Sequence, residues 1–188
     1  MIRLFTAVEI PDDIRRRMAV MCAGVPGARW VPPENMHLTL RFIGEVDGGM
    51  AQDIAAALED IEAPAFEMEL EGVGYFGSGK IPRSIHVNVA RNPAVMHLRD
   101  KIESRIVRMG LPREERKFIP HITLARLKGT HNVRIGAYLE QNNLFRAGPI
   151  AVDHFTLFSS FPTRNGSIYR PEHVYALKGA VNGEWDED

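Results

Sequence analysis

Two tetrapeptides of nearly identical sequence contain the residues of this chain that are best suited to acid–base chemistry. Residues 37–40 read His-Leu-Thr-Leu, and residues 121–124 read His-Ile-Thr-Leu. Imidazole has an unperturbed pKa of about 6.5, so it takes up or releases a proton near neutral pH. A threonine hydroxyl can donate a hydrogen bond to an anion. Two such motifs brought together could transfer protons on either side of a bound phosphate.

Both tetrapeptides lie in β-prone stretches, and strand geometry then determines which side chains share a face. Alternate residues of a strand point the same way, so His37 and Thr39 form one polar face and His121 and Thr123 form another. The two histidines are separated by nearly half of the 188 residues. This spacing predicts two similar lobes, each contributing one motif strand to a cleft between them.

An arginine follows each motif, at Arg41 and at Arg126. A guanidinium group binds phosphate oxygens through paired N–H donors, so both arginines are candidate phosphate ligands. By strict alternation Arg41 shares the face of His37. Arg126 lies on the face opposite to His121, and it reaches the cleft only if the strand ends or bulges near Ala125.

A third copy of the pattern, His-Phe-Thr-Leu at residues 154–157, lacks a preceding proline and a following arginine, so we interpret His154 as unrelated to the site. The remaining histidines are interpreted as structural or solvated: His86, His97, His131 and His173. Catalytic zinc usually takes three protein ligands, and the sequence contains no H-x-H, no H-E-x-x-H and no cysteine pair. We therefore expect no metal and no cofactor.

The elements that must position the motifs alternate irregularly along the chain. Alternating or β-branched runs predict strands at 2–10, 37–43, 66–71, 85–89, 119–127, 150–161 and 169–178. Helical periodicity predicts helices that begin at Pro11 and that span 50–61, 93–109 and 133–140. This order indicates an α+β fold with a largely antiparallel sheet.

Composition excludes several classes of protein. With 45% hydrophobic and 25% charged residues the chain is globular, and we expect one domain over 1–188 with a disordered acidic tail at 183–188. The formal net charge of -1 excludes a protein that coats nucleic acid through bulk charge. The single cysteine, Cys22, is expected to be a buried small side chain. We find neither an export signal nor a long apolar run, which predicts a cytoplasmic location.

The flanks of the motifs extend the pattern over nearly the whole chain. The sequence opens with RLFTAVEIP, continues with HLTLRFIG and FIPHITLAR, and ends with FTLFSSF followed by Tyr169. With these segments the chain resembles the RNA 2′,3′-cyclic phosphodiesterases of the two-histidine (2H) phosphoesterase superfamily, which are also called the 2′-5′ RNA ligase family.

The resemblance implies a bilobal α+β fold that hydrolyses 2′,3′-cyclic phosphate ends of RNA or nucleotides to 2′-phosphates without a metal. It implies that His37 is the proton donor and His121 the proton acceptor. It further implies that Thr39, Thr123 and Arg126 bind the phosphate, with RNA ends or nucleotides as partners and no membrane contact.

Other interpretations remain open on the sequence alone. The same site could join RNA ends through a 2′-5′ linkage, or the fold could be a nucleotide-binding module without turnover. A third possibility is a phosphodiesterase for a small cyclic phosphate derived from ADP-ribose. Phe5 could stack on a base, although its surroundings favour a place in the core.

Overall fold

The computed structural model describes residues 1–78, 80–129 and 132–179, which form one mixed α and β unit. The strands are β1 (Ile2–Glu9), β2 (Ala28–Trp30), β3 (His37–Val46), β4 (Phe66–Ser78), β5 (Ile81–Val89), β6 (His121–Leu127), β7 (Arg146–Val152), β8 (His154–Thr163) and β9 (Gly166–Ala176). The helices are α1 (Asp12–Val20), the 3-10 turn η1 (Pro33–Asn35), α2 (Gly48–Leu58), α3 (Pro93–Arg108) and α4 (Asn132–Asn142). The predicted α+β class with a mainly antiparallel sheet is confirmed.

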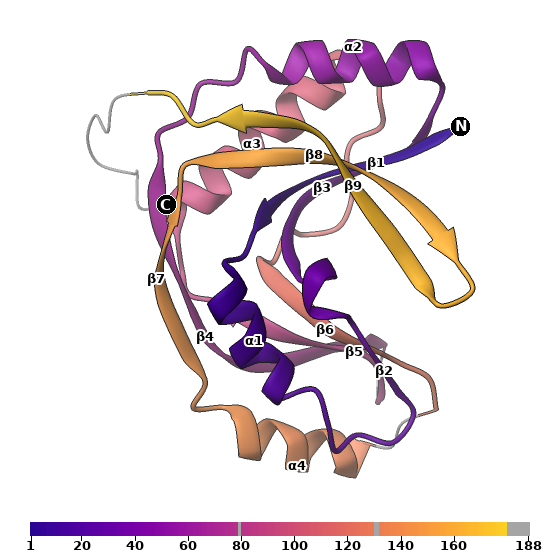
Figure 1. The fold of residues 1–188 in the computed structure, drawn as a ribbon, viewed down its shortest axis with the longest axis vertical. Helices are drawn as coiled ribbons and strands as arrows, with labels where there is room; N and C mark the ends of the chain where they lie inside the picture. The colour runs from indigo at the N-terminus through magenta and orange to yellow at the C-terminus, as the bar shows by residue number, and fades with distance from the viewer. Residues whose placement is uncertain (79, 130–131, 180–188) are drawn as a thin grey trace.

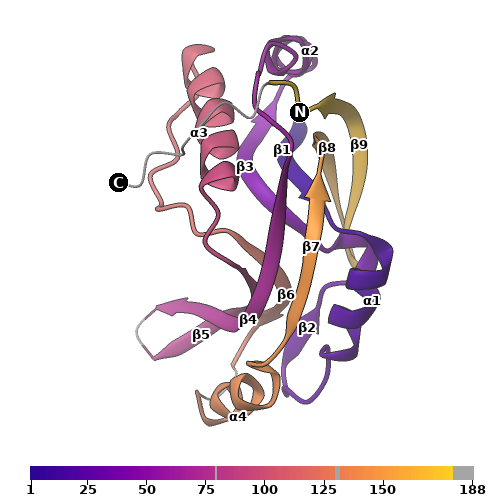
Figure 2. The same cartoon turned by 90° about the vertical axis from the view of Figure 1, so that its left-hand side faces the viewer.

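One sheet runs through the molecule in the order β7-β4-β5-β6-β3-β1-β8-β9, with β2 beside β6. Figure 1 shows β1, β3, β8 and β9 with α2 and α3 in its upper part, and β2, β5, β6 and α4 in its lower part. Figure 2 shows β4 and β7 running lengthwise past both parts. The two motif strands, β3 and β6, are neighbours at the centre, with each belonging to a different part.

Local sequence explains where the helices begin. The side chain of Asn92 accepts hydrogen bonds from the backbone N–H groups of Ala94 (3.0 Å) and Val95 (3.3 Å), and Pro93 follows at the first helical position of α3. Asp47 caps α2 in the same way through the N–H of Met50. Both helices then pack an apolar stripe into the core, α3 against β3 and α2 against β1.

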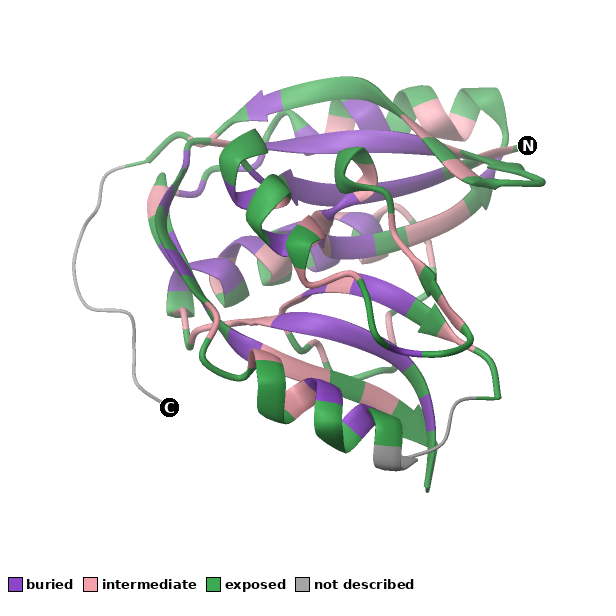
Figure 3. Ribbon diagram, turned by 60° about the horizontal axis from the view of Figure 1, so that its bottom comes forward, coloured by how far each residue is buried: buried purple, intermediate pink, exposed green. Residues whose placement is uncertain are grey.

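The apolar residues of the motifs hold the two central strands in the core. Leu38, Leu40, Ile122 and Leu124 are all 2% exposed or less, and the middle strands are mostly buried in Figure 3. Truncating a buried leucine to alanine typically costs about 2–5 kcal/mol. The polar residues of the motifs are therefore placed by a rigid hydrophobic layer directly behind them.

The structure differs from the predicted elements in several places. Strand β4 continues to Ser78, beyond the predicted end at residue 71, and β5 begins at Ile81 instead of residue 85. The predicted strand 150–161 is two strands, β7 and β8, which separate at Asp153. Gly148 and Pro149 concealed the start of β7, because both residues usually interrupt a strand. The three-residue strand β2 was not predicted at all. Among the described residues, no helix is both long and apolar enough to cross a bilayer. The predicted tail, 183–188, lies outside the described residues.

Candidate active site

The two motifs meet where β3 and β6 pair antiparallel, with Leu38 opposite Ile122. Because both of these residues point into the core, their polar neighbours point the other way. The polar motif residues therefore share one face of the sheet, here called the motif face: His37, Thr39, His121 and Thr123. The sequence prediction that the two copies come together is met by direct pairing of their strands.

The register also sets the spacing of the two imidazoles. His37 and His121 are diagonal neighbours across the strand pair, a relation in which the residues lie about 7–8 Å apart. Two charge-assisted hydrogen bonds of about 2.8 Å, one to each of two oxygens of a phosphate, span a comparable gap. The register therefore puts the two histidines at a spacing of the same order as one bound phosphoryl group.

Each motif strand contains a β-bulge at the last residue of its tetrapeptide. In β3 the pairing with β1 moves from Thr39 to Arg41 and skips Leu40. In β6 the pairing with β5 moves from Thr123 to Ala125 and skips Leu124. A bulge places two successive side chains on one side and reverses the alternation beyond it. The fifth residue after each histidine therefore returns to the motif face.

In β6 that returning residue is Arg126. It is exposed, it follows the buried pair Leu124 and Ala125, and its positive charge acts on the ring of His121. By strand alternation, Arg126 reaches the face of His121 only if a bulge lies near Ala125, and the structure contains this bulge. The bulge brings a guanidinium to the side of the second histidine, where it can bind a phosphate oxygen.

In β3 the corresponding residue is Phe42, which is 55% exposed and lies beside Phe5 with ring centroids 5.8 Å apart. Arg41 instead points to the core side, where its guanidinium forms an ion pair with Glu103 of α3 and donates to the backbone oxygens of Phe42 and Pro112. The expectation that Arg41 shares a face with His37 is wrong, because the bulge at Leu40 reverses the alternation.

The ring of His37 is oriented by Asn35 at the end of η1 and by Thr39 of β3. Its Nδ1 lies 2.6 Å from the backbone oxygen of Asn35, which can only accept, so Nδ1 carries the hydrogen. Its Nε2 lies 2.9 Å from the hydroxyl of Thr39 and accepts from it in the neutral ring. Nε2 is therefore the nitrogen of the neutral ring whose lone pair can take up a proton.

His121 is oriented in the same way. Its Nδ1 donates to the backbone oxygen of Ile119 at 2.6 Å, which leaves Nε2 with a lone pair in the neutral ring. Two further rings contact the imidazole nearly edge-on, Phe76 at 4.8 Å and His86 at 5.2 Å between centroids. Both histidines thus use the carbonyl two residues upstream to select the same reactive nitrogen.

Aromatic side chains surround His37. Phe5 stacks on its ring at 5.0 Å, and Tyr169 meets it edge-on at 5.3 Å. Phe5, Ala7 and Phe158 form a small buried cluster separate from the main core. Phe5 is only 2% exposed, so the expected core role is confirmed. Together these rings exclude water from one side of the first histidine.

This burial shifts both imidazoles toward the neutral form. Desolvation lowers the pKa of His37 to about 4, against the effect of its hydrogen bond to Asn35, and a positive charge on His121 lowers it as well. Burial is also the main cause that lowers the pKa of His121, and Arg126 adds repulsion. Both rings are therefore neutral at pH 7 when no anion lies between them.

The other histidines occupy different surroundings. His154 of the third copy contacts the carboxylates of Asp153 and Glu9, with 3.1 Å to the latter. His173 is exposed on β9, and His131 lies outside the described residues. His86 is neither solvated nor remote: it is 4% exposed and touches His121. Sequence reasoning missed this residue, although alternation in 85–89 put it on a polar strand face.

Among the described residues, no three His, Cys, Asp or Glu side chains gather closely enough to hold a metal ion.

The chain matches a known protein family over most of its length. The profile of the LigT-like phosphoesterases matches residues 8–86 and 88–169, a range that includes both motifs.

Curated relatives match almost end to end. A protein of Aeropyrum pernix named RNA 2′,3′-cyclic phosphodiesterase is 36% identical over 171 residues, which cover 90% of this chain and 96% of that protein. A protein of Thermotoga maritima with the same name is 33% identical over 186 residues, covering 95% and 97%.

Solved structures agree with the sequence relatives. Escherichia coli LigT in complex with 3′-AMP superposes with a TM-score of 0.76 at 26% identity, covering 95% of this chain and 99% of that one. A Thermus thermophilus protein superposes with a TM-score of 0.74 at 26% identity, covering 94% and 98%. This chain belongs to the LigT-like phosphoesterase family.

Proposed function

We propose that this protein hydrolyses the 2′,3′-cyclic phosphate ends of RNA or nucleotides to 2′-phosphates, by acid–base catalysis between His37 and His121 and without a metal. The observation that carries the proposal is the matched orientation of the two imidazoles. Each ring donates from Nδ1 to its own backbone and presents Nε2 on the motif face. The names of the curated relatives support the same substrate class.

The proposed reaction begins at the second motif. Nε2 of neutral His121 takes a proton from a water molecule as its oxygen attacks phosphorus. The bond between phosphorus and the 3′ oxygen breaks, and Nε2–H of protonated His37 delivers its proton to that oxygen. The product is a 2′-phosphate with a free 3′-hydroxyl. Each proton transfer contributes about 10²–10⁴ to the rate.

The bound anion favours the protonated form of the imidazole that acts as the acid, and the proton itself comes from solvent. In the free site both rings are neutral near pH 7, because burial lowers both pKa values. A negative phosphate between the rings favours the charged form of an imidazole and raises its pKa. Substrate binding thus prepares His37 to act as the acid, while Thr39, Thr123 and Arg126 would bind the phosphate oxygens.

The same geometry accommodates a different nucleophile. If a 5′-hydroxyl of a second RNA end replaces water, the steps produce a 2′-5′ linkage instead of a free 2′-phosphate. Water is present at far higher concentration than any RNA end. Hydrolysis therefore dominates unless both ends are held together on the protein.

The direct test incubates the purified protein with a 2′,3′-cyclic mononucleotide in excess EDTA and identifies the product isomer. We expect the 2′-phosphate at an unreduced rate. A 3′-phosphate would contradict the leaving group, and loss of activity in EDTA would contradict the metal-free mechanism. Binding of a 2′-phosphorylated nucleotide without any turnover would favour a binding module.

Variants of the two histidines test their roles separately. We expect His37→Ala and His121→Ala each to lower kcat by at least about 10²-fold, as general acid–base groups do. His154→Ala is the matched control, because it removes the histidine of the third copy. A folded His154→Ala protein with a comparable loss of turnover would mean that another pair performs the chemistry.

A further inference from the structure

A third histidine stands beside the second motif. His86 of β5 lies opposite Thr123 of β6, and Asn88 lies opposite His121. Since residues two apart on a strand share a face, His86 and Asn88 both point to the motif face. The ring of His86 stacks on Phe76 at 4.3 Å between centroids, with an interplanar angle of 28°.

The ring of His86 is fixed in one neutral form. Its Nε2 donates to Oδ1 of Asn88 at 3.0 Å. Its Nδ1 is buried without a hydrogen-bond partner among the described residues. Protonation would create a buried N–H with no acceptor, which is costly. His86 is therefore suited to packing and orientation and unsuited to carrying a proton at neutral pH.

The backbone of the next strand leaves space for this ring. A Cβ atom on Gly74 of β4 would lie 2.8 Å from Nε2 of His86 and 3.2 Å from Oδ1 of Asn88. The backbone of Gly74 does not have a positive φ, so local conformation does not demand glycine. The absence of a side chain at position 74 allows His86 to reach its place against His121.

We propose that His86 is a positioning residue, which with Phe76 forms a two-ring wall that holds the imidazole of His121 in the orientation needed for proton transfer. The hydrogen bond to Ile119 fixes one edge of His121, but a single bond permits the ring to swing about it. The wall contacts the ring at 4.8 and 5.2 Å between centroids and limits that motion. This role in catalysis rests on the function proposed above.

Kinetics of three variants test the proposal. A displacement of about 1 Å of a catalytic group can cost about 10²-fold in rate. We expect His86→Ala to lower kcat by about 10–100-fold while KM for the cyclic nucleotide changes by less than about 3-fold. His86→Phe restores a ring and should retain kcat within about 5-fold. In a His121→Ala background, His86→Ala should cause no further loss, because it acts through His121.

The proposal would be overturned if His86→Ala lowered kcat as much in the His121→Ala background as it does in the wild type. It would also be overturned if His86→Ala alone left kcat unchanged. Gly74→Ala provides an independent route if His86→Ala does not fold. Its added methyl displaces the ring of His86, so it should reproduce the fall in kcat. Gly136→Ala of α4 is the matched control, because a Cβ there meets nothing within 4 Å, and it should leave kcat unchanged.

A measurement without substrate separates this inference from the function. Histidine ring resonances, assigned with the His121→Ala variant, report the pKa and the mobility of His121 in the free protein. In His86→Ala we expect water to replace the wall, so the pKa of His121 should rise toward 6.5 and its ring should become mobile. An unchanged titration would overturn the positioning role. A shifted titration in a protein without turnover would refute only the proposed function.

Discussion

Arg41, which follows the first histidine motif, and Glu103 of α3 form an ion pair in which both side chains are only 7% exposed. The second oxygen of Glu103 accepts from the backbone N–H of Glu114 at 2.8 Å, and Arg41 donates to the backbone oxygen of Pro112. The pair thus ties β3 to the segment that leads into β6. It connects the structural supports of the two motifs on the side of the sheet away from the motif face.

We predict that Arg41→Ala destabilises the fold by about 3–5 kcal/mol, because it leaves the carboxylate of Glu103 buried without a partner. Urea unfolding with the substrate absent measures this change. The double variant Arg41→Met with Glu103→Leu should lose much less stability, since apolar side chains replace both charges. A large loss of kcat/KM with an unchanged free energy of unfolding would instead indicate that Arg41 binds the phosphate.

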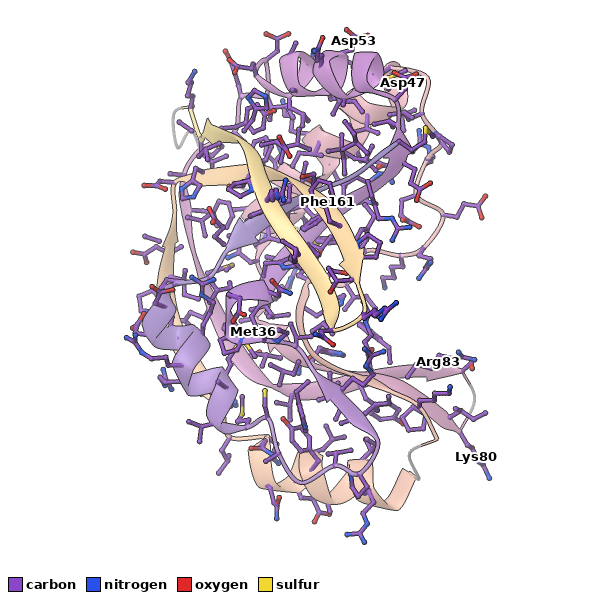
Figure 4. The ribbon with its side chains drawn as sticks, turned by 45° about the vertical axis from the view of Figure 1, so that its right-hand side comes forward. Met36, Asp47, Asp53, Lys80, Arg83 and Phe161 are labelled. Atoms are coloured by element: carbon purple, nitrogen blue, oxygen red, sulfur yellow. The ribbon has the colours of Figure 1, made fainter. Side chains whose placement is uncertain are left out.

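In contrast to Arg41→Ala, we expect Arg126→Ala to lower activity and to leave stability nearly unchanged. Removing one preorganised donor to a phosphoryl oxygen costs about 10²–10³ in rate, so kcat/KM for a cyclic nucleotide should fall by that factor. The free energy of unfolding should change by less than about 0.5 kcal/mol, because the side chain is exposed. Lys80→Ala is the control, since Lys80 extends from the outer end of the β4–β5 hairpin (Figure 4).

The pH profile of kcat/KM should be a bell with its maximum below pH 6.5. The free protein must carry a proton on His37, whose pKa is about 4, and none on His121, whose pKa is lowered from 6.5. The value of kcat/KM therefore decreases when the pH is below the lower of these two pKa values and when it is above the higher one. For kcat, both limbs should lie at higher pH, because the bound anion raises both values. A kcat/KM maximum above pH 7 would contradict this assignment.

Stability should decrease as the pH falls from 6.5 toward 4. His37 and His86 each have a pKa lowered by burial to about 4 in the folded protein, against 6.5 when unfolded. Over this interval the unfolded chain binds more protons, so acid favours unfolding. Tm measured between pH 7.5 and 5 should fall, and His86→Phe should show a smaller fall than the wild type. An equal pH dependence in both proteins would argue against a buried neutral His86.

The sequence was sufficient to predict the α+β class, both motif strands and, within each strand, the common face of its histidine and threonine. It did not predict that the two strands pair directly and put all four residues on one face. Alternation is a short-range property, and it holds from His37 to Thr39 and from His121 to Thr123. It fails two residues later in both strands, at Arg41 and Ala125, because a bulge depends on pairing with β1 or β5 and leaves no clear mark on residue type. This is why Arg41 was placed on the wrong face.

His86 shows that the sequence also could not predict which strands would pair. Alternation in residues 85–89 correctly put His86 and Asn88 on one face, but it could not tell which strand β5 would join. The contact with His121 comes from pairing between strands that are separated by α3 in the chain. Gly74, which leaves space for the ring of His86, lies in the part of β4 beyond the predicted strand 66–71.

Because the two imidazoles are held through main-chain oxygens at positions 35 and 119, their orientation does not depend on which side chains occupy those positions. A substitution at either position can therefore change the side chain beside an imidazole and still leave the carbonyl oxygen that orients the ring.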